Sequence, residues 1–212
     1  LPDSGRILLG EEDSTRQKDY RRALNIGCLY QNPLRGTAPS MTIEENLALA
    51  YTRKASRSFF AVNHRDNAYF RDLLATLGMG LEDRMKTKMG LLSGGQRQAA
   101  SLLMATVARP KLLLLDEHTA ALDPGAAEKV MEITGQIVAR DKITTLMITH
   151  DMDYALSMGS RTIMLSGGRV VLDLSGPERQ AMTAGALAER FYTRPGKRVE
   201  AETISAKNEN SL

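Results

Sequence analysis

The chain has 212 residues, of which 42% are hydrophobic and 25% charged, with a formal net charge of +3. This composition is ordinary for a globular protein with a domain-sized core. The lack of Trp and an aromatic content of 5% argue against a stacking platform for single-stranded nucleic acid. The single cysteine, Cys28, excludes a disulfide within the chain and a cysteine-based metal site. No apolar run approaches the roughly 18–20 residues that span a bilayer.

The first part of the chain predicts two short strands separated by a helix. Pro2 to Gly5 has the composition of a turn, because Pro fixes φ and Gly accepts a positive φ. Residues 6–10 predict a short strand, a polar helical stretch follows through Arg22, and residues 24–30 predict the second strand.

The middle of the chain predicts helices. Thr42 and Glu45 form a capping-box pattern, which marks a helix start. Residues 51–90 are polar and mixed, with helical spacing in their second half. A second capping-box pattern begins at Ser93, and residues 96–108 predict a strong helix that stops before a proline.

The last part alternates apolar strands with helices. Residues 111–115 are continuously apolar, which is typical of a strand buried on both faces of a parallel sheet. A helix from Pro124 to about Asp141 leads to residues 144–149, which predict another buried strand. Two β-like runs flank Gly167–Gly168 and predict a hairpin.

This alternation predicts an α/β fold with a parallel sheet. We expect four segments: residues 1–41 as the N-terminal strands and loop of the core, 42–91 as a helical insertion, 92–194 as the catalytic α/β core, and 195–212 as a disordered polar tail.

Asp116 and Glu117 come directly after a buried apolar strand, so they lie at its carboxyl end. Open α/β sheets bind their ligands at that edge. Hydrolysis of a nucleoside triphosphate needs a carboxylate for Mg²⁺ and a group that orients the attacking water, and two adjacent carboxylates can do both. The alternative is a polar pair that only closes the strand and caps the next turn.

Two further polar residues follow strands of the same predicted sheet. His150 ends the next strand, where an imidazole can bond a γ-phosphate, although a histidine satisfied by backbone is the alternative. Gln31 follows the strand over 24–30, and its amide can contact Mg²⁺ or the attacking water. Alone, Gln31 is a weak signal.

Ser93 and the two glycines after it open a helix, where backbone N–H groups and the helix dipole favour an anion. Each glycine costs about 1 kcal/mol of helix stability relative to alanine, and an anion partner would explain that cost. A plain helix N-cap is the alternative. Asp123, just before Pro124, has a strong structural interpretation as the N-cap of the next helix.

These features occur in one order and with one spacing: Gln31, Leu92–Gln96, Leu112–Glu117, Asp123 and His150. The constellation resembles the ATP-binding subunit of ABC transporters, over nearly the whole chain. The run Leu-Ser-Gly-Gly-Gln is its most specific part. The resemblance implies a P-loop NTPase-like core with a helical insertion, and an ATPase that uses ATP and Mg²⁺.

The resemblance also implies roles for the carboxylates and their neighbours. Asp116 would hold Mg²⁺, and Glu117 would polarise the attacking water. Gln31 would link Mg²⁺ and that water to the membrane partner. His150 would touch the γ-phosphate, and Asp123 would lie in an interface loop.

The signature motif has a role between subunits in the same resemblance. The residues Ser93, Gly94, Gly95 and Gln96 would contact the γ-phosphate of ATP bound to the opposite subunit. The implied machine is a head-to-tail dimer that closes on two ATP molecules and opens after hydrolysis.

The sequence departs from the family pattern in two places. No Gly-x-x-x-x-Gly-Lys-Ser/Thr phosphate loop occurs, and the only Gly-Lys, Gly196–Lys197, precedes Arg198. We therefore expect an N-terminally truncated segment that is inactive alone. His118 stands where the family commonly has Pro, in a variant similar to ATPases of amino-acid-type uptake systems.

The resemblance implies a peripheral subunit on the cytoplasmic face of the cell membrane that energises an importer, of amino acids or similar small solutes. Its partners would be a second ATP-binding subunit, most simply another copy, a transmembrane permease docked on the helical insertion, and indirectly a substrate-binding protein, with no nucleic acid. The alternatives are a non-transport ABC ATPase and a non-catalytic partner that supplies only the signature motif in trans.

Overall fold

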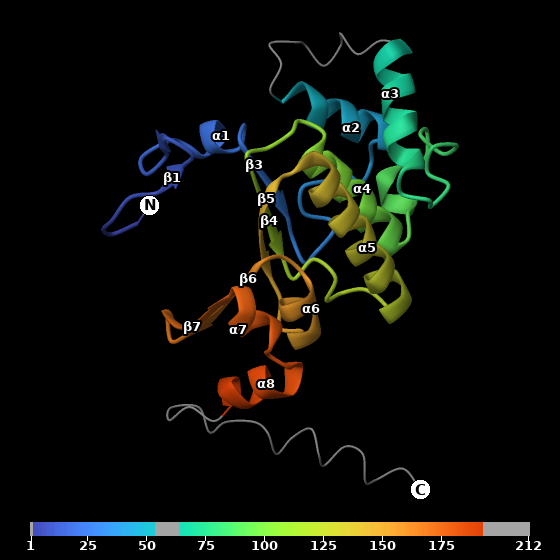
Figure 1. Cartoon of the computed structure of the whole chain (residues 1–212). Coiled ribbons are helices and arrows are strands. Elements are labelled where there is room, and N and C mark those ends of the chain that lie inside the picture. Colours follow the sequence, from blue (N-terminus) through green and yellow to red (C-terminus); the bar gives the residue numbers. More distant parts are fainter. Residues whose placement is uncertain (1, 54–63, 193–212) are drawn as a thin grey trace, which may run out of the picture. The chain divides into compact units, whose positions relative to one another are not determined.

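The computed structural model describes residues 2–53 and 64–192. The chain forms two compact units, one up to Ile148 and the other from Thr149 onward (Figure 1). The predicted tail from residue 195 lies outside the described residues, as does a part of the 51–90 stretch. None of the described helices is long and apolar enough to cross a membrane.

In the first unit the described elements are, in chain order, β1 (Leu8–Leu9), β2 (Glu12–Asp13), α1 (Asp19–Arg22), β3 (Ile26–Leu29), α2 (Ile43–Thr52), α3 (His64–Ala75), α4 (Gly94–Thr106), β4 (Leu112–Asp116), α5 (Pro124–Asp141) and β5 (Thr144–Ile148). A short 3-10 helix over Met89–Leu91 precedes α4.

The predicted parallel sheet is confirmed, with strand order β3-β4-β5. Leu29 pairs with Leu115, and Asp116 pairs with Ile148, both in parallel register. Because the strands run the same way, their carboxyl ends meet at one edge.

The helix predicted through Arg22 was right at its end and wrong at its start. Glu12–Asp13 pairs with Leu8–Leu9 as an antiparallel hairpin, and only Asp19–Arg22 is helical. Polar side chains here accept hydrogen bonds from backbone N–H groups of the hairpin and its flanking residues, and so favour this turn over a helix. The Thr15 hydroxyl accepts a bond from the Ile7 N–H at 2.8 Å, and the Asp13 carboxylate accepts from the Thr15 N–H at 2.9 Å.

Both predicted capping boxes are confirmed. The Thr42 hydroxyl accepts from the Glu45 N–H, and the Glu45 carboxylate accepts from the Thr42 N–H in return. Ser93 and Gln96 make the same reciprocal pair at the start of α4, each bond 3.3 Å long. Each box satisfies two donors at a helix start, which explains why these sequence signals placed both helices correctly.

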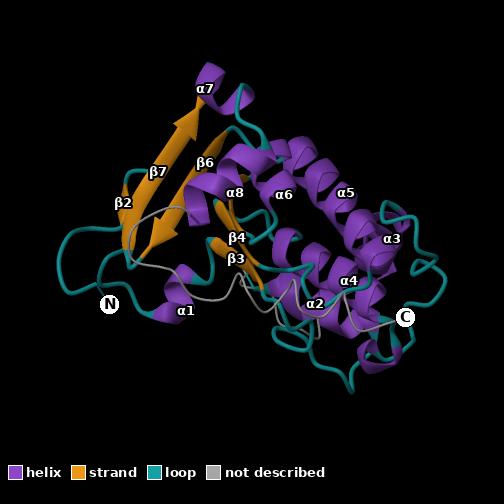
Figure 2. Ribbon diagram, turned by 90° about the horizontal axis from the view of Figure 1, so that it is seen from below, coloured by secondary structure: helices purple, strands orange, loops and turns teal. Residues whose placement is uncertain are grey.

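One hydrophobic core runs through the first unit and joins the helical segment to the sheet. Figures 1 and 2 show α4 and α5 on the same side of the β3-β4-β5 sheet. Helix α4 packs against β3, α5 and α2. Its buried side chains meet those of the helical segment, for example Leu47, Phe70 and Leu74.

The expectation that residues 144–149 form a buried strand was wrong, and β4, expected to be buried on both faces, is fully buried on one face alone. Leu113 and Leu115 of β4, on the helix side, are 0% and 1% exposed. Leu146 and Ile148 of β5 point the other way and are 54% and 55% exposed. Within the first unit α4 and α5 lie on one face of the sheet (Figures 1 and 2), and an apolar run cannot reveal which faces are covered.

The second unit contains α6 (Met152–Ser157), β6 (Arg161–Ser166), β7 (Arg169–Ser175), α7 (Gly176–Gln180) and α8 (Ala184–Tyr192). The predicted hairpin is confirmed as β6 and β7, joined by Gly167 and Gly168. Both glycines have positive φ, 57° and 74°, which glycine adopts without steric cost. A small core of Met164, Leu174 and Leu187 holds this unit together.

Replacing Leu113 with alanine should lower the free energy of unfolding of the first unit by about 2–5 kcal/mol, because the cavity lies in a packed core. Leu146→Ala, on the open face of the same sheet, should cost less than about 1 kcal/mol. Urea denaturation of the two variants measures both losses. Equal losses would contradict the one-sided covering of the sheet.

Candidate functional site

The parallel register places Gln31, Asp116 and Glu117 at one edge of the sheet. Leu29 of β3 pairs with Leu115 of β4. Gln31 lies two residues after Leu29, and Asp116 directly follows Leu115. The side chains of Gln31 and Asp116 are exposed. An amide oxygen and a carboxylate therefore face solvent at the carboxyl ends of neighbouring strands, where α/β sheets bind ligands.

Glu117 has an unusual backbone. Its φ is +44°, in the left-handed region that residues with a Cβ rarely adopt. Its N–H donates to the Ile148 carbonyl of β5 at 3.0 Å, and its own carbonyl accepts from the Ala120 N–H at 3.0 Å. Such a conformation costs on the order of 1–3 kcal/mol and persists only where its surroundings hold it.

His118 is buried beside this strained residue. Its side chain is 2% exposed, and its Nε2 lies 3.2 Å from the Thr134 hydroxyl of α5. Burial lowers the pKa of His118 to about 4, so the ring is neutral at pH 7. The sequence identified His118 as a departure from the family pattern but assigned it no role.

The signature residues form the first turn of α4. Ser93 and Gly94 are exposed, whereas Gly95 is buried. A Cβ on Gly95 would lie 2.9 Å from the Ala126 Cβ, and one on Gly94 would lie 3.2 Å from the Leu122 side chain. Close helix packing is therefore a second reason for the glycine at position 95, besides the anion expected from the sequence.

Asp123 is the N-cap of α5, as predicted. Its carboxylate accepts from the Ala126 N–H at 3.0 Å, and Pro124 follows at the first helical position. Since Gly95 packs on Ala126, the first turns of α4 and α5 lie side by side. The signature and the Asp123 loop thus form one continuous surface.

Gln98 is a buried residue beside the site that was not predicted from the sequence. This α4 side chain is 0% exposed, and its Nε2 donates to the Tyr30 carbonyl at 3.1 Å, one residue before Gln31. Its Oε1 is buried without a hydrogen-bond partner among the described residues. The sequence did hold a signal for this contact, because Gln98 lies one helical turn before Leu102 on the apolar face of α4. A polar side chain on a buried face normally has a hydrogen-bond partner.

His150 belongs to the second unit, two residues beyond Ile148. The next residue, Asp151, caps α6 by accepting from the Tyr154 N–H at 2.9 Å. The predicted role of His150 stays a prediction.

The donors at the sheet edge fit Mg²⁺. Among the described residues no group of three or more His, Cys, Asp or Glu side chains could enclose a metal. Magnesium is usually held by one or two carboxylates together with water and substrate phosphates. Asp116, with the Gln31 amide, would supply such a partial oxygen set.

Gly95→Ala should destabilise the first unit by about 1–3 kcal/mol, because its new methyl group would force α4 and α5 apart. Gly94→Ala should be neutral or stabilising by up to about 1 kcal/mol, since a mobile leucine side chain can yield and alanine favours the helix. Thermal unfolding of the pair checks this. A Gly95→Ala variant as stable as Gly94→Ala would show that packing does not require the glycine.

Acid should destabilise the fold through His118. Folding lowers the pKa of His118 from 6.5 to about 4. Between these two pH values the unfolded chain therefore binds more protons than the folded chain. Stability should therefore decrease as pH falls through this range, by up to ~3 kcal/mol at about 1.4 kcal/mol per pKa unit. His118→Gln cannot titrate and should show a smaller loss in denaturation at each pH. Parallel pH profiles for the two proteins would refute the assignment.

Comparison with known proteins places these features in a family. A sequence model described as ABC transporter matches residues 1–120. The "Tyrosine transport ATP-binding protein" of Clostridioides difficile is 42% identical over 189 residues, which cover 89% of this chain and 75% of that protein. A "Sulfate/thiosulfate import ATP-binding protein" of Chromobacterium violaceum is 32% identical over 98% of this chain, which spans only 50% of that relative.

A solved structure agrees with the fold. The ATP-binding cassette MJ0796, in a dimeric post-hydrolysis state bound to ADP and Pi, superposes with a TM-score of 0.69 at 25% identity. The match covers 82% of this chain and 74% of that one. From the signature helix, the strand-end carboxylates and these likenesses together, we conclude that the chain belongs to the ABC transporter family of ATP-binding proteins.

Proposed function

We propose that this chain is part of a protein that hydrolyses ATP to drive an ABC-type membrane importer. The observation that carries the proposal is the sheet edge where Asp116 and Glu117 follow β4 and Gln31 follows the neighbouring β3. Names of relatives support import: one is a tyrosine transport protein and another a sulfate/thiosulfate import protein.

In the proposed mechanism the two carboxylates divide the chemistry. Asp116 would hold Mg²⁺ together with the Gln31 amide oxygen, and an ion held there would supply neutralisation of the phosphate charge. Glu117 orients the attacking water and accepts its proton. Its backbone is held by bonds to β5 and to the following turn, which fix the direction in which its side chain leaves the chain.

The signature turn serves ATP held by another subunit. The first N–H groups of a helix lack backbone partners within it and attract anions; the Ser93 hydroxyl accepts from the Gln96 N–H, and the exposed Gly94 leaves the start of this turn open. Gly95 and Gln96 complete the turn that would face the γ-phosphate. The dimeric state of the structural neighbour supports a dimer, which we propose to be of two identical subunits.

Two residues would complete the interface. Asp123 holds the loop before α5 beside the signature turn, where a second subunit would contact both. His150, two residues beyond the end of β5, would hydrogen-bond the γ-phosphate. The phosphate loop itself is absent from the printed residues, so we expect the 212-residue chain alone to be inactive.

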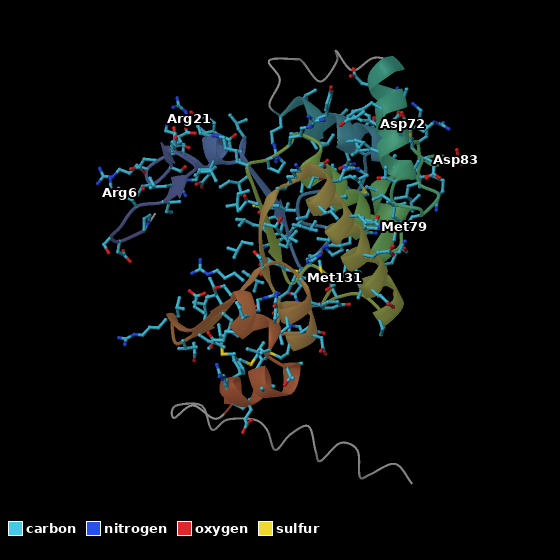
Figure 3. The ribbon with its side chains drawn as sticks, viewed as in Figure 1. Arg6, Arg21, Asp72, Met79, Asp83 and Met131 are labelled. Atoms are coloured by element: carbon cyan, nitrogen blue, oxygen red, sulfur yellow. The ribbon has the colours of Figure 1, made fainter. Side chains whose placement is uncertain are left out.

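We propose that the helical segment over residues 42–91 docks the permease at the cytoplasmic face of the membrane. Figure 3 labels Asp72 and Asp83 of this segment, both of which are exposed, and Asp83 forms an exposed ion pair with Arg71. An amino acid or similar small solute is the proposed cargo, since the tyrosine relative shares the highest identity quoted above. A substrate-binding protein would complete the importer.

Glu117→Gln should reduce ATP hydrolysis by the full gene product about 10²- to 10⁴-fold, the usual contribution of a general base. ATP binding should persist, because the substitution keeps the shape and removes only the charge. Phosphate release and nucleotide titration measure the two properties.

Glu128→Gln is the matched control, since Glu128 is exposed on α5. It should hydrolyse ATP like the wild type. A Glu117→Gln enzyme with wild-type turnover would refute the proposed role, and Glu117-dependent turnover by the 212-residue chain would refute its expected inactivity.

A further inference from the structure

The strained backbone of Glu117 needs an anchor on each side. On the N-terminal side the β4–β5 ladder ends with Asp116 paired to Ile148, whose carbonyl also accepts the Glu117 N–H. On the C-terminal side the chain turns through His118 into the loop before α5. A residue with φ of +44° tends to relax unless both sides are fixed.

The His118 ring supplies a tertiary contact on the C-terminal side. It is buried, and its Nε2 meets the Thr134 hydroxyl at 3.2 Å. Thr134 donates its only hydroxyl proton to the Val130 carbonyl at 2.7 Å. The threonine oxygen can therefore only accept from the ring, so Nε2 carries the hydrogen and acts as the donor.

We propose that His118 is a positioning residue, which holds the turn of Glu117 against α5 through a hydrogen bond from its Nε2 to Thr134. For its effect on catalysis this inference rests on the proposed function above. The ring is too deeply buried, at 2% exposure, to meet a substrate itself, so it acts through the backbone of its neighbour.

Only a side chain that places a hydrogen-bond donor where His118 has its Nε2 can replace the histidine in this contact. The Nε2 atom of glutamine can occupy nearly the place of Nε2 in histidine, whereas the asparagine amide corresponds to Nδ1 and is too short. His118→Gln should therefore keep the contact, and His118→Asn and His118→Leu should lose it. For the acceptor of this hydrogen bond, Thr134→Ser keeps the hydroxyl oxygen, and Thr134→Val removes it with little change of shape.

Amide hydrogen exchange at Glu117 in the full gene product tests the anchoring without reference to ATP. The His118→Leu, His118→Asn and Thr134→Val variants should exchange this amide about 3- to 10-fold faster, as expected for one lost hydrogen bond. His118→Gln and Thr134→Ser should match the wild type. Amides within α4 serve as the control for overall loosening, and they should not change.

Single-turnover ATP hydrolysis tests the catalytic consequence. The three variants that lose the bond should hydrolyse ATP about 3- to 10-fold more slowly with unchanged ATP affinity, and the double variant His118→Leu/Thr134→Val should be no slower than either single one. Equal exchange at Glu117 in all variants, or failure of glutamine to rescue, would overturn the inference. If the wild type hydrolyses no ATP, the proposed function fails, while the exchange data still decide the anchoring.

Discussion

The parallel register of β3, β4 and β5 is the constraint on which the rest of the site depends. It pairs Leu29 with Leu115 and Asp116 with Ile148, so polar residues that lie far apart in sequence reach one edge of the sheet. Burial of Leu113 and Leu115 beneath the helices fixes which way β4 faces. A shift of one residue would turn these leucines to the open side of the sheet. The hydrophobic core and the candidate chemistry are therefore set by the same register.

A second constraint is the close approach of α4 and α5 at Gly95. The absence of a side chain there lets the signature turn lie against Ala126, three residues after the Asp123 cap. On the same helix, Gln98 reaches the Tyr30 carbonyl beside the Gln31 loop. One helix thus contacts both the loop before α5 and the end of β3. This packing ties the position of the signature turn to the end of β3.

The sequence predicted the features that depend on local interactions. The capping pairs at Thr42 and Ser93 and the Gly167–Gly168 turn satisfy their own backbone groups, so their patterns were reliable. The start of the helix predicted through Arg22 was wrong because the hairpin bonds of Asp13 and Thr15 leave no trace in hydrophobic spacing. The exposure of β5, the buried amide of Gln98 and the contact of His118 with Thr134 depend on which distant elements pack together, which a single sequence does not show. The roles of the predicted site residues remain predictions.

We propose above all that the carboxyl edge of this sheet forms a magnesium-dependent ATP site in the full gene product. Substituting Mn²⁺ for Mg²⁺ and titrating it in the presence of ATP, with electron paramagnetic resonance as the readout, measures metal binding there directly. The account predicts that Asp116→Asn weakens Mn²⁺ binding to the ATP complex about tenfold, the loss typical of a disturbed metal-site residue, whereas the α5 surface variant Glu128→Gln does not. Unchanged Mn²⁺ affinity in Asp116→Asn would contradict the account.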